Sequence, residues 1–274
     1  MKKRRGFIGA ISNYKGGTGK TVTAVNLSSI LAIKGEKILL VDNDPQSDST
    51  RALIQDQSMI HNCIYDLLDP DSEKKPLVKD CIYPTIHSGL DILPNISETS
   101  GLEIPLSIKF PESNFTLRNQ IYDYTTNNYD YVFIDCPPTL SVFVSNALYC
   151  ADFVMIPMMA GSGNSLEGIK GVLELMDSVQ KNGNANLKFL KILINKVDKR
   201  KSAHKANVTS AERRFGQDKI FLQTIPTSSD FETIEAMRQT SIFSYASGSK
   251  GATAFRKLSV EFTKFFENIR NSEG

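Results

Sequence analysis

The sequence contains no tryptophan, no C-x-x-C pair and no apolar run long enough to cross a bilayer. Its four cysteines are scattered, so neither a structural zinc site nor a disulfide framework is expected. A membrane-spanning helix needs about 20 apolar residues in succession. These absences predict a cytoplasmic protein with reduced thiols and no transmembrane segment.

A strong excess of charge is also missing, because 32 Lys and Arg face 30 Asp and Glu, a formal net charge of +2. Any basic interaction surface must therefore be local. The basic start, Met1–Arg5, resembles the first part of a signal peptide, but Asn13 cuts the apolar stretch after it short. With 41% hydrophobic residues and no evident linker or repeat, we expect residues 1–274 to form a single domain.

Short apolar runs alternate with helical patterns along most of the chain, with a less regular stretch at 51–88. Such alternation is typical of a parallel sheet covered on both faces. We therefore expect an α/β three-layer sandwich with a mostly parallel twisted sheet. The expected strands are 7–11, 37–41, 90–93, 131–134, 153–158, 189–194 and 220–225. The expected helices are 22–33, 61–68, 115–125, 141–150, 166–180, 203–215, 231–238 and 251–270.

A glycine-rich stretch separates the first expected strand from the first expected helix. The glycines let backbone N–H groups turn inward, and the helix start adds the positive end of its dipole, so the stretch is expected to bind phosphate. Lys20 would reach the β- and γ-phosphates, and the Thr21 hydroxyl would ligate Mg²⁺. The expected nucleotide-binding residues here are Lys15, Gly16, Gly17, Thr18, Gly19, Lys20, Thr21 and Val22.

The loop departs from the pattern G-x-x-x-x-G-K-[ST], because Tyr14 stands at the first glycine position and Lys15 precedes Gly16. In this form, K-G-G-x-G-K-T, it resembles the deviant Walker A loop of the ParA/Soj and MinD group of P-loop ATPases. The resemblance implies that Lys15 crosses a dimer interface to touch the partner's nucleotide. Tyr14 replaces the family's usual Gln, and Val22 replaces a Thr that helps to hold the α-phosphate. We expect somewhat weaker nucleotide binding and intact hydrolysis.

Acidic residues follow two other expected strands. Asp135 stands where a Walker B aspartate belongs and is expected to hold Mg²⁺ through water. The stretch from Asp42 to Gln46 matches the family's D-x-D-P-Q element. By resemblance, Asp44 positions the attacking water, acting with Lys15 and Lys20, and Asp42 lies near the metal. The carboxyl ends of parallel strands share one edge of a sheet, so these groups are expected to converge.

The stretch Asn195-Lys196-Val197-Asp198 spells N-K-x-D, the guanine-reading motif of GTPases. In ParA-like proteins the same strand end faces the base and adenine is read largely by backbone groups, so the resemblance favours ATP over GTP. Asn195 is an expected base contact in either case. By resemblance, Pro226 begins the loop that contacts adenine.

A basic cluster follows this motif. The residues expected to bind DNA are Lys199, Arg200, Lys201, Lys205, Arg213, Arg214 and Arg238. Lys250, Arg256 and Lys257 are candidates to join them in space. The resemblance implies non-specific binding of double-stranded DNA through phosphate contacts, without an added N-terminal helix-turn-helix. A solvated helix face explains the same charges without a ligand.

The C-terminal helix admits two interpretations. Phe255, Leu258, Phe262, Phe265 and Ile269 share one face, which would pack on the core or, as in MinD, lie on a membrane. Core packing needs fewer assumptions, so membrane binding is not expected.

Taken as a whole, the resemblance implies a nucleoid-associated, Mg²⁺-dependent ATPase that forms a homodimer with ATP. A ParB-like or cargo adaptor protein would stimulate its hydrolysis, and the cycle would segregate or position a plasmid, a chromosome origin or a protein assembly. A MinD-like membrane ATPase and a metabolic ATP-dependent ligase on the same scaffold are the alternatives. A ligase would not need Lys15.

Overall fold

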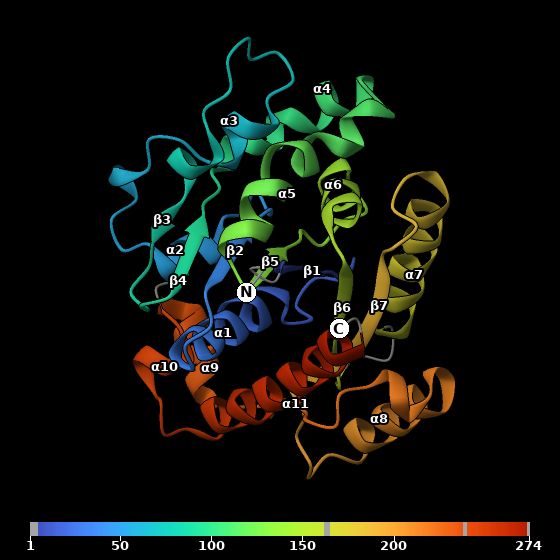
Figure 1. The fold of residues 1–274 in the computed structure, drawn as a ribbon. Coiled ribbons are helices and arrows are strands. Elements are labelled where there is room, and N and C mark those ends of the chain that lie inside the picture. The colour runs from blue at the N-terminus through green and yellow to red at the C-terminus, as the bar shows by residue number, and fades with distance from the viewer. Residues whose placement is uncertain (1–4, 162–164, 238–239, 273–274) are drawn as a thin grey trace.

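The computed structural model of the chain describes residues 5–161, 165–237 and 240–272. Its middle layer is a seven-stranded sheet in the order β3-β4-β2-β5-β1-β6-β7, in which β3 alone pairs antiparallel to its neighbour (Figure 1). The strands are β1 (Phe7–Ile11), β2 (Ile38–Asp42), β3 (Tyr83–Pro84), β4 (Leu90–Leu93), β5 (Tyr131–Asp135), β6 (Phe153–Met159) and β7 (Lys188–Asn195). The expected mostly parallel sheet is confirmed.

Helices cover both faces of the sheet, as its continuously apolar strands require. They are α1 (Lys20–Ile33), α2 (Asp48–Leu53), α3 (Ile64–Leu68), α4 (Glu103–Ile108), α5 (Thr116–Asn128), α6 (Val142–Cys150), α7 (Ser165–Asn182), α8 (Ser202–Phe215), α9 (Ser229–Met237), α10 (Ile242–Tyr245) and α11 (Lys250–Ser272). One core packs α3, α5, α6 and α7 on the sheet, and the other packs α1, α10 and α11 on the opposite face. The short elements α2, α4, α10 and β3 were not predicted.

The register of the central strands positions the site. Ile11 at the end of β1 and Asp42 at the end of β2 both pair with Asp135 at the end of β5. Because these strands are parallel and end in line, the segments that follow them emerge side by side at one edge of the sheet.

Residues 220–225 do not form the expected last strand. Phe221 and Ile225 donate backbone hydrogen bonds to β7, and only isolated bridges form beside it. Between them, the amides of Leu222 and Gln223 donate to the carboxylate of Glu261 on α11, at 3.0 and 3.2 Å. The carboxylate of Glu261 therefore binds amides in the middle of this segment, which interrupts the hydrogen bonding of the segment to β7.

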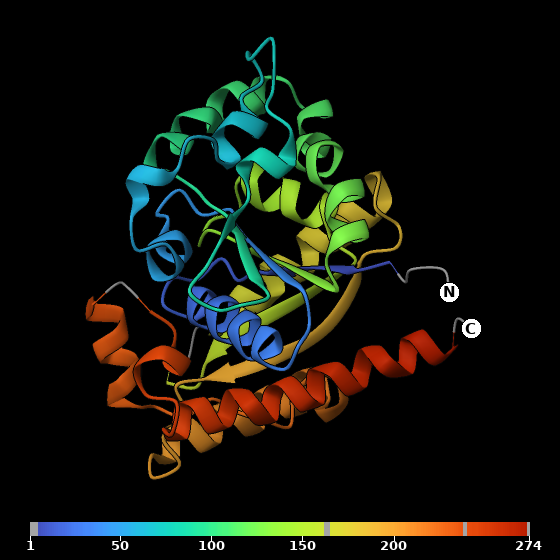
Figure 2. The ribbon, with the colours of Figure 1, turned by 60° about the vertical axis from the view of Figure 1, so that its left-hand side comes forward.

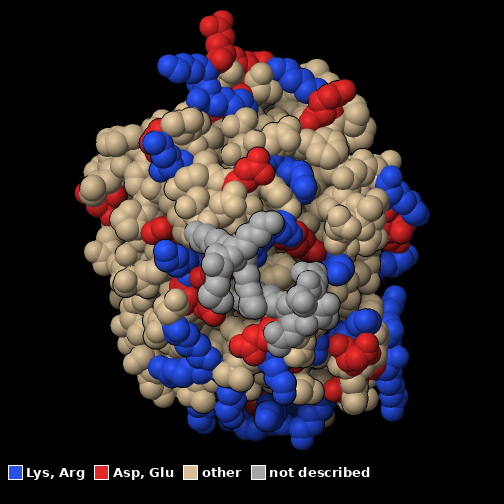
Figure 3. All heavy atoms as spheres, viewed as in Figure 1, with Lys and Arg blue, Asp and Glu red and all other residues tan. Residues whose placement is uncertain are grey.

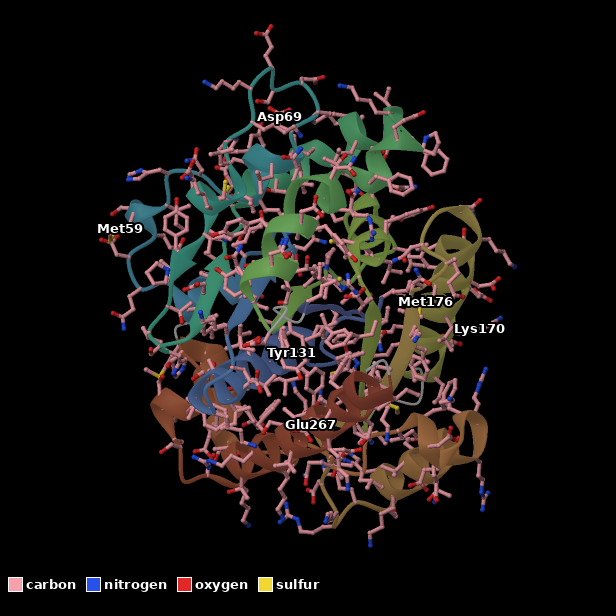
Figure 4. The ribbon with its side chains drawn as sticks, viewed as in Figure 1. Met59, Asp69, Tyr131, Lys170, Met176 and Glu267 are labelled. Atoms are coloured by element: carbon pink, nitrogen blue, oxygen red, sulfur yellow. The ribbon has the colours of Figure 1, made fainter. Side chains whose placement is uncertain are left out.

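The apolar face of α11 is buried against the sheet. Phe255 and Phe262 are fully buried, and Phe266 is 2% exposed. Tyr131 lies between the sheet and α11, with its ring 5.2 Å from that of Phe262 and 5.5 Å from that of Phe266 (Figure 4). This packing confirms the core interpretation of the helix. Within the described part of the chain, no helix combines the length and apolarity that crossing a bilayer requires.

Candidate nucleotide-binding site

The loop between β1 and α1 presents an uncapped helix start. Gly19 is the N-cap residue of α1, no described side chain caps the helix, and its first turn carries no acidic residue. Gly19 has φ +85°, and a Cβ there would lie 2.6 Å from Nδ2 of Asn195, so glycine is required for both conformation and space. The first amides of α1 and the positive end of its dipole are thus available to phosphate oxygens.

Lys20 folds back over this loop. Its side chain is largely buried, and its Nζ donates to the backbone oxygen of Lys15 at 3.2 Å. Burial lowers the pKa of Lys20, while the nearby carboxylates of Asp135 and Asp44 act in the opposite direction. The three side chains that the sequence predicted from separate segments therefore lie within electrostatic reach of one another.

Asp42 and Asp135 form a buried acidic pair on adjacent strands. Asp42 Oδ2 accepts from the amide and the hydroxyl of Thr50 at 2.8 and 2.7 Å, and Asp135 Oδ2 accepts from the hydroxyl of Ser49 at 2.8 Å. Burial raises the pKa of Asp42 to about 8 and that of Asp135 to about 7. The mutual repulsion of the pair adds to the rise at Asp42.

The Asp135 carboxylate is suited to a cation. Its buried Oδ1 has no hydrogen-bond partner among the described residues, while the hydroxyl of Thr21 lies close enough to counteract the raised pKa. Within the described residues no cluster of three or more His, Cys, Asp or Glu could hold a metal by itself. One carboxylate and one hydroxyl, here from Asp135 and Thr21, form a donor set that Mg²⁺ uses when water and phosphate oxygens complete its coordination shell. The site therefore fits Mg²⁺ bound together with a nucleotide.

Asp44 lies in the loop between β2 and α2. Its Oδ1 accepts from the amide of Gln46 at 2.9 Å, which shapes the turn. Burial raises the pKa of Asp44, and the charge of Lys20 lowers it. A half-buried carboxylate beside the phosphate-binding lysine is able to accept a proton from water held at that position.

A cavity of about 370 Å³ opens beside these groups. Its lining includes the loop glycines, Lys20, Thr21 and Val22 on one side and Asp44, Gln46 and Asp48 on another. Phe231 and Ile234 of α9 add an apolar wall next to Val25 of α1. The cavity thus combines an anion-binding end with an apolar side, as a nucleotide requires.

The side chain of Lys15 contacts Glu167 and Tyr14. Its Nζ lies 3.8 Å from Oε2 of Glu167 on α7 and 5.3 Å from the centre of the Tyr14 ring. The backbone of Lys15 belongs to the loop, but its side chain lies along the outside of the subunit.

Asn195 anchors the loop in this structure. Its Nδ2 donates to the backbone oxygen of Thr18 at 2.9 Å and to the hydroxyl of Thr23 at 3.2 Å, and its buried Oδ1 has no partner among the described residues. Lys196, which follows it, has φ +54° and lines the 370 Å³ cavity.

Asp198 and Pro226 line a second cavity, of about 690 Å³, away from the phosphate-binding loop. The Asp198 carboxylate accepts two hydrogen bonds from the Arg200 guanidinium, both at 3.0 Å. This contact lowers the pKa of Asp198. The aspartate of the N-K-x-D stretch is therefore engaged by its own neighbour.

The expected DNA-binding residues are exposed, apart from Arg238, which lies outside the described residues. Lys199 and Arg200 line the 690 Å³ cavity together with Lys250 and Lys257 of α11. Of the three residues that were candidates to join the basic cluster in space, Lys250 and Lys257 therefore do so. Figure 2 shows α8 beside α11, and Figure 3 shows Lys and Arg gathered along the lower edge of the molecule over these helices. We call Lys199, Arg200, Lys201, Lys205, Arg213, Arg214, Lys250 and Lys257 the basic face.

The sequence analysis missed Ser49 and Thr50, which orient the buried acidic pair from α2. The only signal for them is a pair of hydroxyl residues shortly after the D-x-D-P-Q element. It also missed Phe231 and Ile234 as cavity residues, because a short amphipathic helix far along the chain gives no indication of which cavity it lines.

The raised pKa of Asp135 leads to a prediction about how the stability of the protein depends on pH. The pKa of Asp135 is about 7 in the folded protein and about 3.9 in an unfolded chain, so the wild type loses stability as the pH rises from 4 to 7. Asp135→Asn should therefore raise the free energy of unfolding at pH 8, by about 4 kcal/mol at most for a pKa that is about three higher in the folded protein, and leave it almost unchanged at pH 4. Urea titration of the nucleotide-free protein measures both values.

Asp123→Asn, on the exposed side of α5, is the control and should change neither value. Destabilisation by Asp135→Asn at pH 8, or an equal gain at both pH values, would show that burial does not raise this pKa.

Comparisons with known proteins agree with this geometry. The family described as AAA domain (AAA_31) matches residues 7–189. Soj of Bacillus subtilis, a sporulation initiation inhibitor protein, is 34% identical over 257 residues, covering 93% of this chain and 98% of Soj. The chromosome partitioning protein ParA of Caulobacter vibrioides is 34% identical over 218 residues, 79% of each chain.

Solved structures show the same fold. Cobyrinic acid a,c-diamide synthase of Mycobacterium smegmatis, with an ATP analog and magnesium bound, superposes with a TM-score of 0.80 at 24% identity, covering 96% of both chains. That identity is low enough for the likeness to concern the fold alone. The match to Soj, in contrast, extends over nearly the full length of both sequences, and the chain therefore belongs to the ParA/Soj family of partition ATPases.

Proposed function

We propose that residues 1–274 act as one Mg²⁺-dependent ATPase domain that dimerises with ATP and binds DNA without sequence preference. The observation that carries this proposal is that Lys20 and Asp44 line one cavity at an uncapped helix start, with the buried carboxylate of Asp135 within electrostatic reach of Lys20. Phosphoryl transfer requires positioning and charge neutralisation, and these groups supply both.

In the proposed site, the amides of residues 16–21 and Lys20 bind the phosphates. Thr21 and Asp135 would hold Mg²⁺, Asp135 through water, and Asp42 would lie near the metal on the adjacent strand. The metal, when bound, neutralises charge on the β- and γ-phosphates. Asp44 orients the attacking water and accepts its proton. The apolar side of the cavity would take the base and the ribose.

The nucleotide is proposed to be ATP. Reading guanine would require the Asp198 carboxylate to face the base, but it is bound by Arg200 and lines the second cavity. The similarity to the chromosome-partitioning ATPase Soj of Thermus thermophilus, 32% identical over 252 residues, supports the same choice. Asn195 then acts mainly by fixing the loop through Thr18. Pro226 lines the second cavity together with Asp198, so the same argument leaves it without a base contact.

The proposed dimer joins two sites face to face. Lys15 is not among the described residues that line its own subunit's phosphate cavity, and its Nζ lies beside Glu167 of α7. In the dimer it would reach the phosphates of the partner's nucleotide. A site completed in this way couples ATP binding to dimerisation and hydrolysis to dissociation.

The basic face is proposed to hold the DNA backbone. Its residues are exposed and come from the β7–α8 loop, α8 and the start of α11, and a dimer would double the number of phosphates that they neutralise. A ParB-like or cargo adaptor protein would then stimulate hydrolysis and release the dimer, which segregates or positions the cargo near the nucleoid.

The double variant Arg213→Ala/Arg214→Ala tests this assignment. Binding of random-sequence duplex DNA with ATP should weaken about tenfold, because two cations that neutralise phosphates are removed. The slope of log K against log salt should become shallower by about 0.9 for each phosphate that the protein no longer neutralises. Fluorescence anisotropy over a salt series measures both quantities.

Lys74→Ala/Lys79→Ala removes the same charge from exposed residues elsewhere and is the matched control. A salt slope equal to that of the wild type in the Arg213→Ala/Arg214→Ala protein would remove α8 from the DNA-binding surface.

The alternatives receive less support. A MinD-like membrane contact would need the apolar face of α11, which is buried. A metabolic ligase would explain the phosphate-binding loop but would give no role to Lys15.

A further inference from the structure

The first two turns of α7 pack directly against the unusual part of the phosphate-binding loop. A Cβ at Gly168 would lie 2.2 Å from Oδ1 of Asn13 and 2.9 Å from Cγ of Lys15. A Cβ at Gly171 would lie 2.6 Å from Cε1 of Tyr14. Any larger residue at these helical positions would force the side chains of Asn13, Tyr14 and Lys15 to shift. The two glycines, three positions apart, thus form a seat for Asn13, Tyr14 and Lys15.

Lys15 is fixed within this seat by contacts from its own subunit. Oδ1 of Asn13 accepts from the Lys15 amide at 3.0 Å, which sets the backbone. The Nζ of Lys15 faces the Tyr14 ring and lies 3.8 Å from Oε2 of Glu167, and the Lys15 side chain is 36% exposed. The cation therefore has two partners, one aromatic and one anionic, before any second subunit is present.

We propose that Glu167 is a positioning residue that holds Lys15 on its own subunit and thereby opposes the ATP-dependent dimer. This inference rests on the proposed function, in which Lys15 must reach the partner's phosphates. One ammonium group cannot bind Glu167 and a distant phosphate together, so each subunit must break its Lys15–Glu167 contact when the dimer forms. The Lys15–Glu167 contact would then raise the concentrations of ATP and of protein at which the dimer forms.

The size of the effect follows from the exposure of the pair. Exposed ion pairs shift an equilibrium by about 1.5- to 5-fold. Because a symmetric dimer breaks two such pairs, removing the Glu167 charge should strengthen the dimer by about 2- to 25-fold. The gain should shrink in high salt, which screens an exposed pair.

The test compares Glu167→Gln with Glu174→Gln, both in an Asp44→Ala background that holds ATP unhydrolysed. Glu174 lies two turns further along α7 and pairs with Lys170, which points outward (Figure 4), so it offers a matched loss of charge. Sedimentation equilibrium with ATP should give a tighter dimer for Glu167→Gln alone, with the difference reduced in 0.5 M NaCl. The affinity for ADP should be the same in Asp44→Ala alone and in its combinations with Glu167→Gln and with Glu174→Gln. A variant with a disturbed fold would bind ADP more weakly.

A second measurement does not depend on the dimer. In nucleotide-free protein, acetic anhydride should modify Lys15 at least about twice as fast in Glu167→Gln as in the wild type, with Lys196 as the internal reference, because a paired ammonium group reacts slowly. Mass spectrometry of peptides gives the rates.

The outcomes separate the two ideas. Faster modification of Lys15 without any ATP dimer would refute the proposed function and leave the cis contact in place. An unchanged modification rate, or a dimer that Glu167→Gln weakens or leaves unchanged, would overturn the role of Glu167.

Discussion

Lys20→Ala should reduce the affinity for both ADP and ATP by at least about 100-fold. The Lys20 ammonium group is largely buried beside Asp135 and Asp44, and Lys20 lines the cavity next to the loop glycines that are proposed to bind phosphate. Without it, those carboxylates would repel the phosphates and the charge-assisted hydrogen bonds would be absent. At about 1.4 kcal/mol per tenfold, the weaker binding corresponds to about 2.8 kcal/mol.

Isothermal titration with ADP measures this affinity without turnover. Lys34→Ala, at the exposed C-terminal end of the same helix, is the control and should bind ADP normally. A cooperative thermal transition in both variants would show that they fold. Wild-type affinity in Lys20→Ala would mean that the nucleotide binds elsewhere.

Asp44→Ala should slow ATP hydrolysis by at least about 100-fold while ADP affinity stays within about threefold of the wild type. In the proposed site the loop amides and Lys20 bind the phosphates, whereas Asp44 acts on the water that attacks them. Removing a positioned proton acceptor costs about two to four powers of ten in rate. Phosphate release in single-turnover reactions measures the chemical step.

Asp56→Ala removes an exposed carboxylate a few residues further along the chain and should leave the rate unchanged. If Asp44→Ala hydrolysed ATP at the wild-type rate, another group would have to position the water, and the D-x-D-P-Q element would lose its assigned role.

The parts of the fold predicted from the sequence are those that local pattern determines. Continuous apolar strands indicated a covered parallel sheet, and the register that pairs both Ile11 and Asp42 with Asp135 follows from strands that start and end together. The convergence of Lys20, Asp44 and Asp135 could be expected for the same reason.

The parts that the sequence could not predict depend on contacts between distant segments. Residues 220–225 have a strand-like pattern, but the Glu261 carboxylate takes two of their amides. Asn195 is in the expected place, yet its amide group serves the phosphate-binding loop because Gly19 leaves space for it. Neither contact leaves a periodic signal in the sequence.

The two departures from the family's loop now have structural locations. Tyr14 lies against Gly171 of α7, so the aromatic ring belongs to the seat around Lys15. Val22 lines the nucleotide cavity, where it offers a methyl group in place of a hydroxyl. We expect Tyr14 to influence dimerisation and Val22 to influence nucleotide affinity.

The molar mass of Asp44→Ala in the presence of ATP tests the central claim most directly. Light scattering after size exclusion should give a species of twice the 30.4 kDa chain mass with ATP and Mg²⁺, and a single chain with ADP. The ATP species should revert to a monomer when Lys15 is also replaced by Ala. A monomer with saturating ATP, or a dimer that is indifferent to the nucleotide and to Lys15, would contradict the account.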